Sequence, residues 1–382
     1  MGNVVTRKNS FGGRFLNSIG AVFIGLALIV ICLIALGCNE RRNVTAIRAY
    51  DEVGKNLIET GSAQANPGND GRLVAIRGSL SFSPVSDSSY RITANSFVLI
   101  RAVEMYQWRE IQRGSSTDGE ITYEYSGGWE SSSINSDRFY DKSYANKPWP
   151  SDEAFQRKSV YAEDVQLGDF RVTPEQLSSL SASSIFTIPE NAQFPQGFRR
   201  SADGRYICSG DLSDPKIGDL RISFLTSEVT RASMLGRQQG NAIVSYTSKN
   251  GTRIDRLFAG EMSGAEMVAY LQAENSAITW ILRIILTILV CAGFAMFLTP
   301  VQVLVSVIPF IGKFLGKATK TVAQVIGAIA GVTLSLLVIA ISWIAVRPLV
   351  AIPLLVVTAL LIALLVRYRK SKANGASQPS VS

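Results

Sequence analysis

The chain of 382 residues contains no histidine and only four cysteines. Without imidazole groups it has no Ser/His or Cys/His catalytic pair and no histidine metal ligand. Cys32 and Cys291 lie inside apolar runs and Cys38 closes one, so Cys208 is the one thiol of the polar middle part. A disulfide within that part is excluded and a zinc site is disfavoured. A bridge between Cys38 and Cys208 stays open in an oxidising compartment, although two reduced thiols are the simpler expectation.

Acidic residues are missing from both ends of the chain. All 30 lie between Glu40 and Glu274, whereas 12 of the 38 basic residues lie outside that interval. Residues 39–276 therefore carry a net charge of −4, and the rest of the chain carries +12. A nucleic-acid-binding protein concentrates positive charge on its folded domain. Here the positive charge flanks apolar runs, which indicates a membrane protein and no nucleic-acid partner.

Four apolar runs are long enough to cross a membrane, which takes about 20 residues of helix. They cover residues 15–38, 277–299, 321–346 and 348–366. A cleaved signal peptide, or a lipoprotein signal that ends at Cys38, is the alternative for the first run, but a signal core has only about 7–15 residues, and an uncleaved anchor is favoured. Residues 300–320 contain two prolines and three lysines, and they predict an interfacial or re-entrant segment followed by a cytoplasmic loop.

Basic residues at the ends of these runs predict the orientation of the chain. With four crossings, ten of them share one side, opposite Arg347. The positive-inside rule then places residues 1–14 and the tail, 367–382, in the cytoplasm. Residues 39–276 are expected on the other side, which is the periplasm in a bacterium and the ER lumen or perinuclear space in a eukaryote. The ten residues are Arg7, Lys8, Arg14, Lys313, Lys317, Lys320, Arg367, Arg369, Lys370 and Lys372.

The polar middle part predicts a β-rich domain. Alternating apolar and polar residues predict strands over 72–78, 96–108, 120–125, 204–208, 220–225 and 242–247. Helices are expected over 44–60 and 263–274, the second with Ser263 and Glu266 at the spacing of a capping box. A repeated Gly-Asp pattern at 167–172 and 217–222 indicates two turns that open strands, and leaves two related subdomains as an alternative. The predicted fold is thus an α+β membrane protein with four transmembrane helices and a large extracytoplasmic domain.

Residues near the ends of the predicted membrane helices are the candidate lipid-binding or interface residues. Arg283 lies a few residues inside the second run, at the same outer level as Arg347. Both could hold lipid phosphates or a domain carboxylate such as Glu274, or extend to the interface without a specific partner. Gly327 and Gly331 are spaced for close helix packing, within the chain or between copies. The full candidate set adds Trp280, Lys313, Lys317 and Lys320, and no catalytic, cofactor-binding or metal-ligating residue is predicted.

Two other function classes stay open. Glu104, Glu124 and Glu130 could form a carboxylate pair of a lipid- or envelope-modifying enzyme, which a deep pocket and raised pKa values would favour. The aromatic residues of 104–150 could form a binding surface, although cross-strand packing is the commoner role. An oligomeric channel is a weaker alternative, because it needs a polar pathway and no predicted span carries Asp or Glu.

Several segments carry a family resemblance in the same order along nearly the whole chain. They are Asn-Asp-Gly-Arg-Leu-Val at 69–74, Val-Glu-Met-Tyr-Gln-Trp at 103–108, Gly-Trp-Glu-Ser-Ser-Ser-Ile-Asn-Ser at 128–136 and Ile-Gly-Asp-Leu-Arg-Ile-Ser-Phe at 217–224. Asn-Glu-Arg at 39–41, Thr-Trp-Ile-Leu-Arg at 279–283 and Arg-Pro-Leu at 347–349 continue the match. The chain resembles the LUMA family, also called the transmembrane protein 43 family.

This resemblance implies four membrane spans and a large lumenal domain. Eukaryotic members lie in the ER and the inner nuclear membrane, self-associate, and are thought to organise membrane protein complexes with lamins and emerin. No catalytic residues are established for the family. We therefore expect a non-enzymatic membrane scaffold without a cofactor, whose partners are membrane lipids, other membrane proteins and further copies of itself, in the ER or a bacterial inner membrane.

Overall fold

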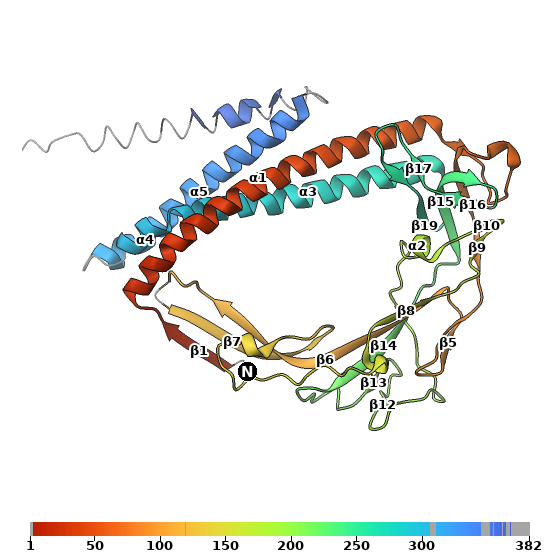
Figure 1. Ribbon diagram of the computed structural model, residues 1–382, viewed down its shortest axis with the longest axis horizontal. Coiled ribbons are helices and arrows are strands. Elements are labelled where there is room, and N and C mark those ends of the chain that lie inside the picture. Colours follow the sequence, from red (N-terminus) through yellow and green to blue (C-terminus); the bar gives the residue numbers. More distant parts are fainter. Residues whose placement is uncertain are drawn as a thin grey trace, which may run out of the picture. The chain divides into compact units, whose positions relative to one another are not determined.

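A computed structural model describes residues 3–118, 120–305, 311–344, 352–353, 355–360, 362–363 and 367; the side chains of 3, 305, 311–320 and 323 fall outside the description. The chain forms two compact units, each described by itself (Figure 1). A β-rich unit comprises Met1–Thr6, Ala49–Arg113 and Thr122–Leu271, and a helical unit comprises Arg7–Arg48, Gly114–Ile121 and Gln272–Ser382. The predicted mixed α+β class is confirmed.

Two large sheets build the β-rich unit. The first has eight strands: β1 (Asn3–Lys8), β7 (Glu120–Glu130), β6 (Val98–Arg113), β14 (Leu220–Thr226), β13 (Ile207–Cys208) and β12 (Arg199–Arg200) in this order, with β11 (Ser184–Ile185) on β14 and β8 (Lys158–Tyr161) on β6. The second has seven: β19 (Arg256–Ala259), β15 (Arg231–Gln239), β16 (Ala242–Val244), β10 (Phe170–Arg171), β9 (Gln166–Leu167), β3 (Leu73–Ser81) and β2 (Ile58–Glu59), with β15 also beside β3.

Short elements complete this unit. Two small hairpins pair β4 (Val85–Asp87) with β5 (Ile92–Ala94) and β17 (Tyr246–Thr247) with β18 (Arg253–Ile254). The one-turn helix α2 (Pro174–Leu177) and the 3-10 turns at Pro67–Asn69, Ser136–Arg138 and Glu153–Phe155 begin at Thr or Asx side chains, which cap the first free N–H groups. The predicted strands all coincide with observed ones in part or in full.

The first four residues of strand β3 are buried on both faces and separate two apolar clusters. Val74 and Ile76 point into the main core, which they share with residues of β6 and β14 such as Val103 and Phe224. Leu73 and Ala75 alternate to the opposite face, because successive side chains of a strand point in opposite directions. That second face is covered by the last turns of α1 and the first turns of α3, including Ala49, Val53, Met267 and Leu271.

The two Gly-Asp turns occupy different sheets. Gly168 adopts φ +58° in the tight turn between β9 and β10, and Gly218 adopts φ +94° in the turn before β14. Both conformations favour glycine because a Cβ atom is strained there. The pattern therefore forms turns that open strands, and the two strands belong to two sheets that share one core.

The helical unit is built from three long helices and one short one. Helix α1 (Phe11–Asn56) contains the first predicted span. It continues without a break into the helix predicted over 44–60, because no proline interrupts it. Helix α3 (Gly264–Phe297) likewise joins the helix predicted over 263–274 to the second span, and Ser263 and Glu266 form the predicted capping box. Helix α4 (Thr299–Val305) follows, with Pro300 in its first turn.

Helix α5 (Ile311–Ile344) starts ten residues before the predicted third span. Within the part of the chain that the structure describes, three helices, in α1, α3 and α5, are long and apolar enough to cross a membrane. Within the fourth predicted span, 348–366, residues 352–353, 355–360 and 362–363 are described and helical, and the rest of the span falls outside the described residues, as do Arg347 and most of the basic tail.

Candidate functional site

An ion pair buried among the three apolar helices is the most specific polar arrangement of the helical unit. Arg283 on α3 donates from Nε to Oε1 of Glu40 and from Nη2 to Oε2, each at 2.7 Å. Trp343 on α5 donates its indole N–H to Oε2 of the same carboxylate at 2.6 Å. Glu40 is fully buried and the Arg283 side chain is 12% exposed. One carboxylate of α1 therefore joins all three helices.

The geometry suits a structural lock. A bidentate arginine–carboxylate pair combines two charge-assisted hydrogen bonds in a fixed orientation. The guanidinium also lies over the rings of Trp280, at 4.7 Å, and Trp343, at 5.8 Å. Such cation–π contacts strengthen when they are desolvated. Because both oxygens of Glu40 already accept hydrogen bonds from protein groups, the carboxylate is poorly placed to serve as a catalytic base.

A layer of polar side chains continues the contact between α1 and α3 toward the β-rich end of these helices. Arg42 donates to Oδ1 of Asn275 at 3.1 Å and to Oγ1 of Thr279 at 3.0 Å. Asn275 donates to Oδ1 of Asn43 at 2.6 Å. Asn43, Asn275 and Thr279 are buried. Hydrogen bonds between buried polar side chains fix one register of two helices, because a shifted register leaves those groups unsatisfied.

Arg283 has a different partner from those considered in the sequence analysis. Lipid phosphates and Glu274 were the expected acidic partners, whereas the structure pairs Arg283 with Glu40. Trp280, with 58% of its surface exposed, covers the guanidinium from outside. Glu40 was the residue missed by sequence reasoning. The available signal was one carboxylate directly after the first apolar run and one arginine at a matching depth in the second.

Small residues bring the helices into close contact further toward the C-terminal end of α3 than the ion pair. A Cβ atom at Gly331 would lie 2.6 Å from Sγ of Cys291, and one at Gly327 would lie 3.0 Å from the backbone nitrogen of Ala295. Gly327 and Gly331 thus pack α5 against α3 within one chain. Gly25 and Gly293 make a similar contact between α1 and α3, where a Cβ atom at Gly25 would lie 2.6 Å from the Gly293 carbonyl oxygen.

The remaining candidate residues contribute no described contact. Lys313, Lys317 and Lys320 lie on α5, but their side chains fall outside the described part of the chain, and so does Arg347. The structure therefore brings together Trp280 and Arg283 around Glu40, and Gly327 and Gly331 against α3.

The three carboxylates of the enzyme alternative are each paired with an arginine of the β-rich unit. Glu104 accepts from Arg221 at 2.7 Å, and Glu124 accepts from Arg113 at 2.6 Å. Glu130 pairs with Arg109. The hydrogen bond from Arg113 lowers the pKa of Glu124, which is the direction opposite to that of a general acid. These contacts give the carboxylate-enzyme alternative no support.

Aromatic residues of 104–150 pack on one another across strands. Tyr106 meets Trp129 edge-on at 5.4 Å, and Tyr125 stacks on Tyr144 at 4.1 Å. Burial and a hydrogen bond to Glu110 raise the pKa of Tyr125 to about 12. These contacts are of the kind expected for sheet packing.

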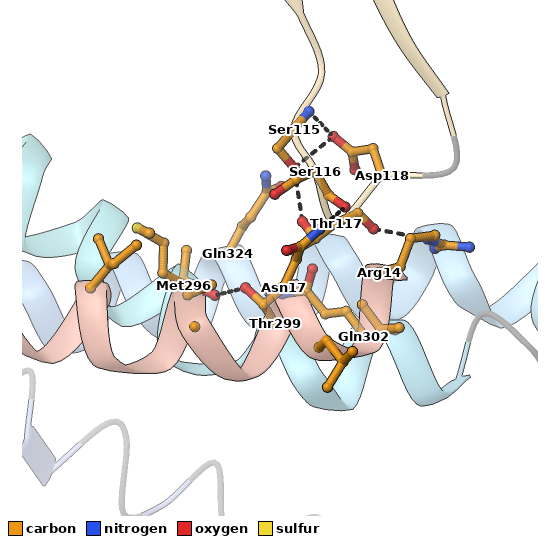
Figure 2. A pocket seen from close by; sticks show the side chains of 16 residues that line it. Arg14, Asn17, Ser115, Ser116, Thr117, Asp118, Met296, Thr299, Gln302 and Gln324 are labelled. Carbon is orange, nitrogen blue, oxygen red and sulfur yellow. Dashed lines mark hydrogen bonds between the residues drawn. The ribbon is translucent and has the colours of Figure 1, made fainter. Parts of the chain in front are cut away.

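A cavity of about 630 Å³ lies where α1 begins, in the helical unit (Figure 2). Its walls come from the first turns of α1, the Met296 end of α3, α4, and Gln324 of α5. The remaining wall is the tip of the β6–β7 hairpin, Ser115–Asp118, which we call the hairpin tip. Asn9, Arg14 and Asn17 hold the tip by donating to the carbonyl oxygens of Asp118, Thr117 and Ser116 at 2.9, 3.0 and 3.3 Å.

Comparison with known proteins decides the family. The family model described as Transmembrane protein 43 matches residues 105–348, which include Arg283 and Trp343. The chain belongs to the transmembrane protein 43 family. The resemblance read from the sequence motifs is thereby confirmed, and the chain is a membrane protein of this family.

Relatives in this family extend the match to most of the chain. Transmembrane protein 43 of Homo sapiens is 28% identical over 358 residues, covering 89% of this chain and 88% of the human protein. The Mus musculus protein is 27% identical over 355 residues, with 88% and 87% covered. The Transmembrane protein 43 homolog of Drosophila melanogaster is 25% identical over 340 residues, with 84% and 87% covered. No solved structure matches the chain.

Proposed function

We propose that this protein is a non-enzymatic integral membrane scaffold that self-associates and organises membrane proteins or membrane structure. The observation that carries the proposal is the buried contact of Glu40 with Arg283 and Trp343. It makes one rigid bundle of three helices and uses the carboxylate for structure, so the bundle can present fixed surfaces to lipids and partners.

The exposed faces of the helices support this role. Phe23, Ile31 and Ile34 of α1 are more than 60% exposed, and Ile281 and Ile288 of α3 are more than half exposed. Apolar surface of this extent is stable against lipid tails or against other membrane helices. The chain keeps its close glycine contacts inside the bundle, so we expect copies to meet through these larger apolar side chains or through the β-rich unit.

The charge distribution supports a cytoplasmic location of the basic helix ends, with the β-rich unit on the other side. One observation counts against that placement of the β-rich unit: β1 precedes the first apolar run and pairs with β7, which follows it. Site-specific labelling distinguishes the two arrangements.

Particle mass in nanodiscs tests the scaffold proposal. We expect the wild-type chain of 41.4 kDa to form a defined oligomer, measured by mass photometry, and to lose it on Arg283→Ala substitution. Arg205→Ala, an exposed arginine of the β-rich unit, is the matched control and should leave the mass unchanged. A wild-type particle containing one copy at all concentrations would contradict self-association.

A further inference from the structure

Two triplets of the sequence have the form Asn-X-Ser/Thr, with X other than proline, that N-linked glycosylation requires. They are Asn43-Val44-Thr45 and Asn250-Gly251-Thr252. So short a pattern also occurs by chance. An oligosaccharide is bulky and hydrated, and a folded protein accommodates it only on an exposed side chain. Burial therefore decides which of the two asparagines can carry a glycan.

The first triplet is unsuited to glycosylation in the folded protein. Asn43 lies in helix α1 and is buried, with 5% of its surface exposed. Its Oδ1 accepts a hydrogen bond from Nδ2 of Asn275 on α3 at 2.6 Å. A sugar attached to this buried amide would push the two helices apart, at a layer that Arg42 also bridges through Asn275 and Thr279.

The second triplet lies at the tip of a hairpin of the β-rich unit. Asn250 is exposed in the turn between β17 and β18, which pair in antiparallel register. Gly251 beside it is also exposed and adopts φ +85°. A Cβ atom at Gly251 would meet nothing within 4 Å. The turn thus has open space around the middle of the triplet.

Hydrogen bonds hold the asparagine and the hydroxyl residue of this triplet face to face. Oδ1 of Asn250 accepts from the backbone N–H of Thr252 at 3.2 Å and from the Thr252 hydroxyl at 2.8 Å. An asparagine that accepts from the backbone two residues further on forms an Asx-turn. The amide and the hydroxyl are the two groups that define the acceptor triplet, and the turn brings them to the same side of the chain.

The base of the hairpin is attached to the C-terminal end of α1 (Figure 1). Tyr246 donates its hydroxyl to Oε1 of Glu52 at 2.8 Å, and the backbone N–H of Lys249 donates to Oε2 at 3.0 Å. At about 1.5 Å per residue, Glu52 lies about 21 Å along the helix beyond Cys38, where the first apolar run ends. The headgroup zone is only about 5–8 Å thick on each side of the hydrocarbon. The hairpin is therefore attached well beyond the headgroups.

We propose that Asn250 receives an N-linked oligosaccharide when the chain is made in a eukaryotic cell. Its Nδ2 attacks the anomeric carbon of the first sugar of an oligosaccharide linked to a polyprenyl pyrophosphate. A C–N bond forms, the C–O bond to the pyrophosphate breaks, the lipid pyrophosphate leaves with the electron pair, and the amide gives up one proton to the transferase. The proposal rests on the proposed placement of the β-rich unit on the lumenal side, where this transfer takes place. It goes beyond the scaffold role by naming a modified residue and its sugar donor.

Glycan attachment is measured on the full chain expressed in cultured mammalian cells, as gel mobility before and after treatment with peptide N-glycosidase. That enzyme converts the glycan-bearing asparagine to aspartate, and peptide mass spectrometry locates the converted residue. We expect the wild type to carry one glycan, at Asn250. Asn250→Asp keeps the Oδ1 acceptor of the turn but lacks the acceptor nitrogen, so it should carry none.

Substitutions of the hydroxyl residues separate recognition from folding. Thr252→Ser keeps the hydroxyl and should keep the glycan, whereas Thr252→Val has a similar shape without the hydroxyl and should lose it. Thr45→Val removes the buried triplet without changing Asn43, and should leave the glycan count unchanged. A glycan on Thr252→Val, or a glycan found on Asn43 in place of Asn250, would overturn the proposal.

A second acceptor separates this proposal from the placement of the β-rich unit. Asn191 is exposed in a turn of that unit, and Gln193→Thr makes it the first residue of a new triplet. We expect two glycans on this variant. A glycan on Asn191 and none on Asn250 would overturn the proposal and leave the lumenal placement intact. No glycan on either residue would overturn both.

Discussion

At the scale of single residues, the cost of burying Glu40 decides how the helical unit responds to mutation. A carboxylate without water is stable only while its partners remain, and removing one partner of a buried ion pair typically costs about 3–5 kcal/mol. Replacing both partners by apolar residues of similar size is often neutral. We therefore expect the effects of substituting Glu40 and Arg283 on the free energy of unfolding to be strongly non-additive.

We predict that Glu40→Ala and Arg283→Ala each destabilise the protein by about 3–5 kcal/mol, and that Glu40→Leu/Arg283→Met together recover most of this loss. The measurement is thermal unfolding in detergent followed by circular dichroism. Glu124→Ala, which removes a pair with a 66% exposed arginine side chain, is the control and should cost below about 1 kcal/mol. Additive effects of the two single substitutions would contradict a direct pair.

The two cysteines nearest the polar part should differ in reactivity. Cys38 is exposed, whereas Cys208 is buried. Burial raises the pKa of Cys208. We predict fast maleimide labelling of Cys38 at pH 7 and slow labelling of Cys208.

The pH dependence follows from that raised pKa. Labelling of Cys208 should accelerate as the pH rises above the ordinary thiol value of about 8.5, because only the thiolate reacts. Above the ordinary thiol value, the Cys208 thiol of the folded protein keeps its proton at pH values where the unfolded thiol has lost it. The contribution of Cys208 to the free energy of unfolding is therefore complete below the ordinary thiol pKa and is lost as the pH rises above it. Fast labelling of Cys208 at pH 7 in the folded protein would show that this part of the β-rich unit opens.

At the scale of elements, glycine contacts set the distance between α3 and α5. We predict that Gly331→Ala destabilises the protein by about 1–3 kcal/mol, because the added methyl group overlaps Cys291, including its backbone. Gly20→Ala is the matched control in a helix. Its Cβ atom meets nothing within 4 Å, so it should be neutral or stabilising by up to about 1 kcal/mol. Equal effects of both substitutions on the unfolding temperature would contradict close packing at Gly331.

The strands that could be predicted from the sequence are those in which apolar and polar residues alternate clearly. The strands at 72–78, 96–108 and 220–225 alternate and lie on β3, β6 and β14. Strand β15, Arg231–Gln239, was not predicted, since it is buried on both faces over most of its length and contains Gly236, so it shows no alternation.

The site was predictable only in part, for a similar physical reason. Arg283, Trp280 and the glycine pair stand out in apolar runs, because such residues are expensive or unusual there. Glu40 does not, since it lies beyond the end of its run among polar residues. Its role depends on the unbroken continuation of α1, which brings Arg283 and Trp343 to the same level.

At the scale of the whole molecule, the pairing of β1 with β7 bears on the orientation in the membrane. A crossing by residues 15–38 separates β1 from β7 unless the β6–β7 hairpin passes through the bilayer. Arg109, Glu110 and Arg113 make that passage costly in lipid. The orientation predicted from charge thus makes the hairpin tip accessible from the extracytoplasmic side, whereas the strand pairing makes it accessible from the side of the N-terminus.

We predict that cysteines placed at Asn9 and Asp118 form a crosslink, because the Asn9 side chain donates to the Asp118 carbonyl at 2.9 Å. The measurement is a gel shift after mild oxidation in sealed vesicles, with Cys38→Ser to remove the exposed native thiol. Asn9→Cys alone, without the second cysteine at Asp118, is the control and should not crosslink. Labelling of a cysteine at Ser116 from the extracytoplasmic side, without a crosslink, would instead support the charge-based orientation and remove the hairpin tip from the cavity.

Helix α1 carries a mechanical consequence because it runs unbroken for 46 residues, about 69 Å. One part of the helix faces lipid. In its last two turns, Ala49 and Val53 pack against the second sheet. Membrane helices adjust their tilt when bilayer thickness changes. We therefore expect the stability of the β-rich unit to depend on the thickness of the surrounding bilayer, because a helix without a joint passes such a change on to the sheet.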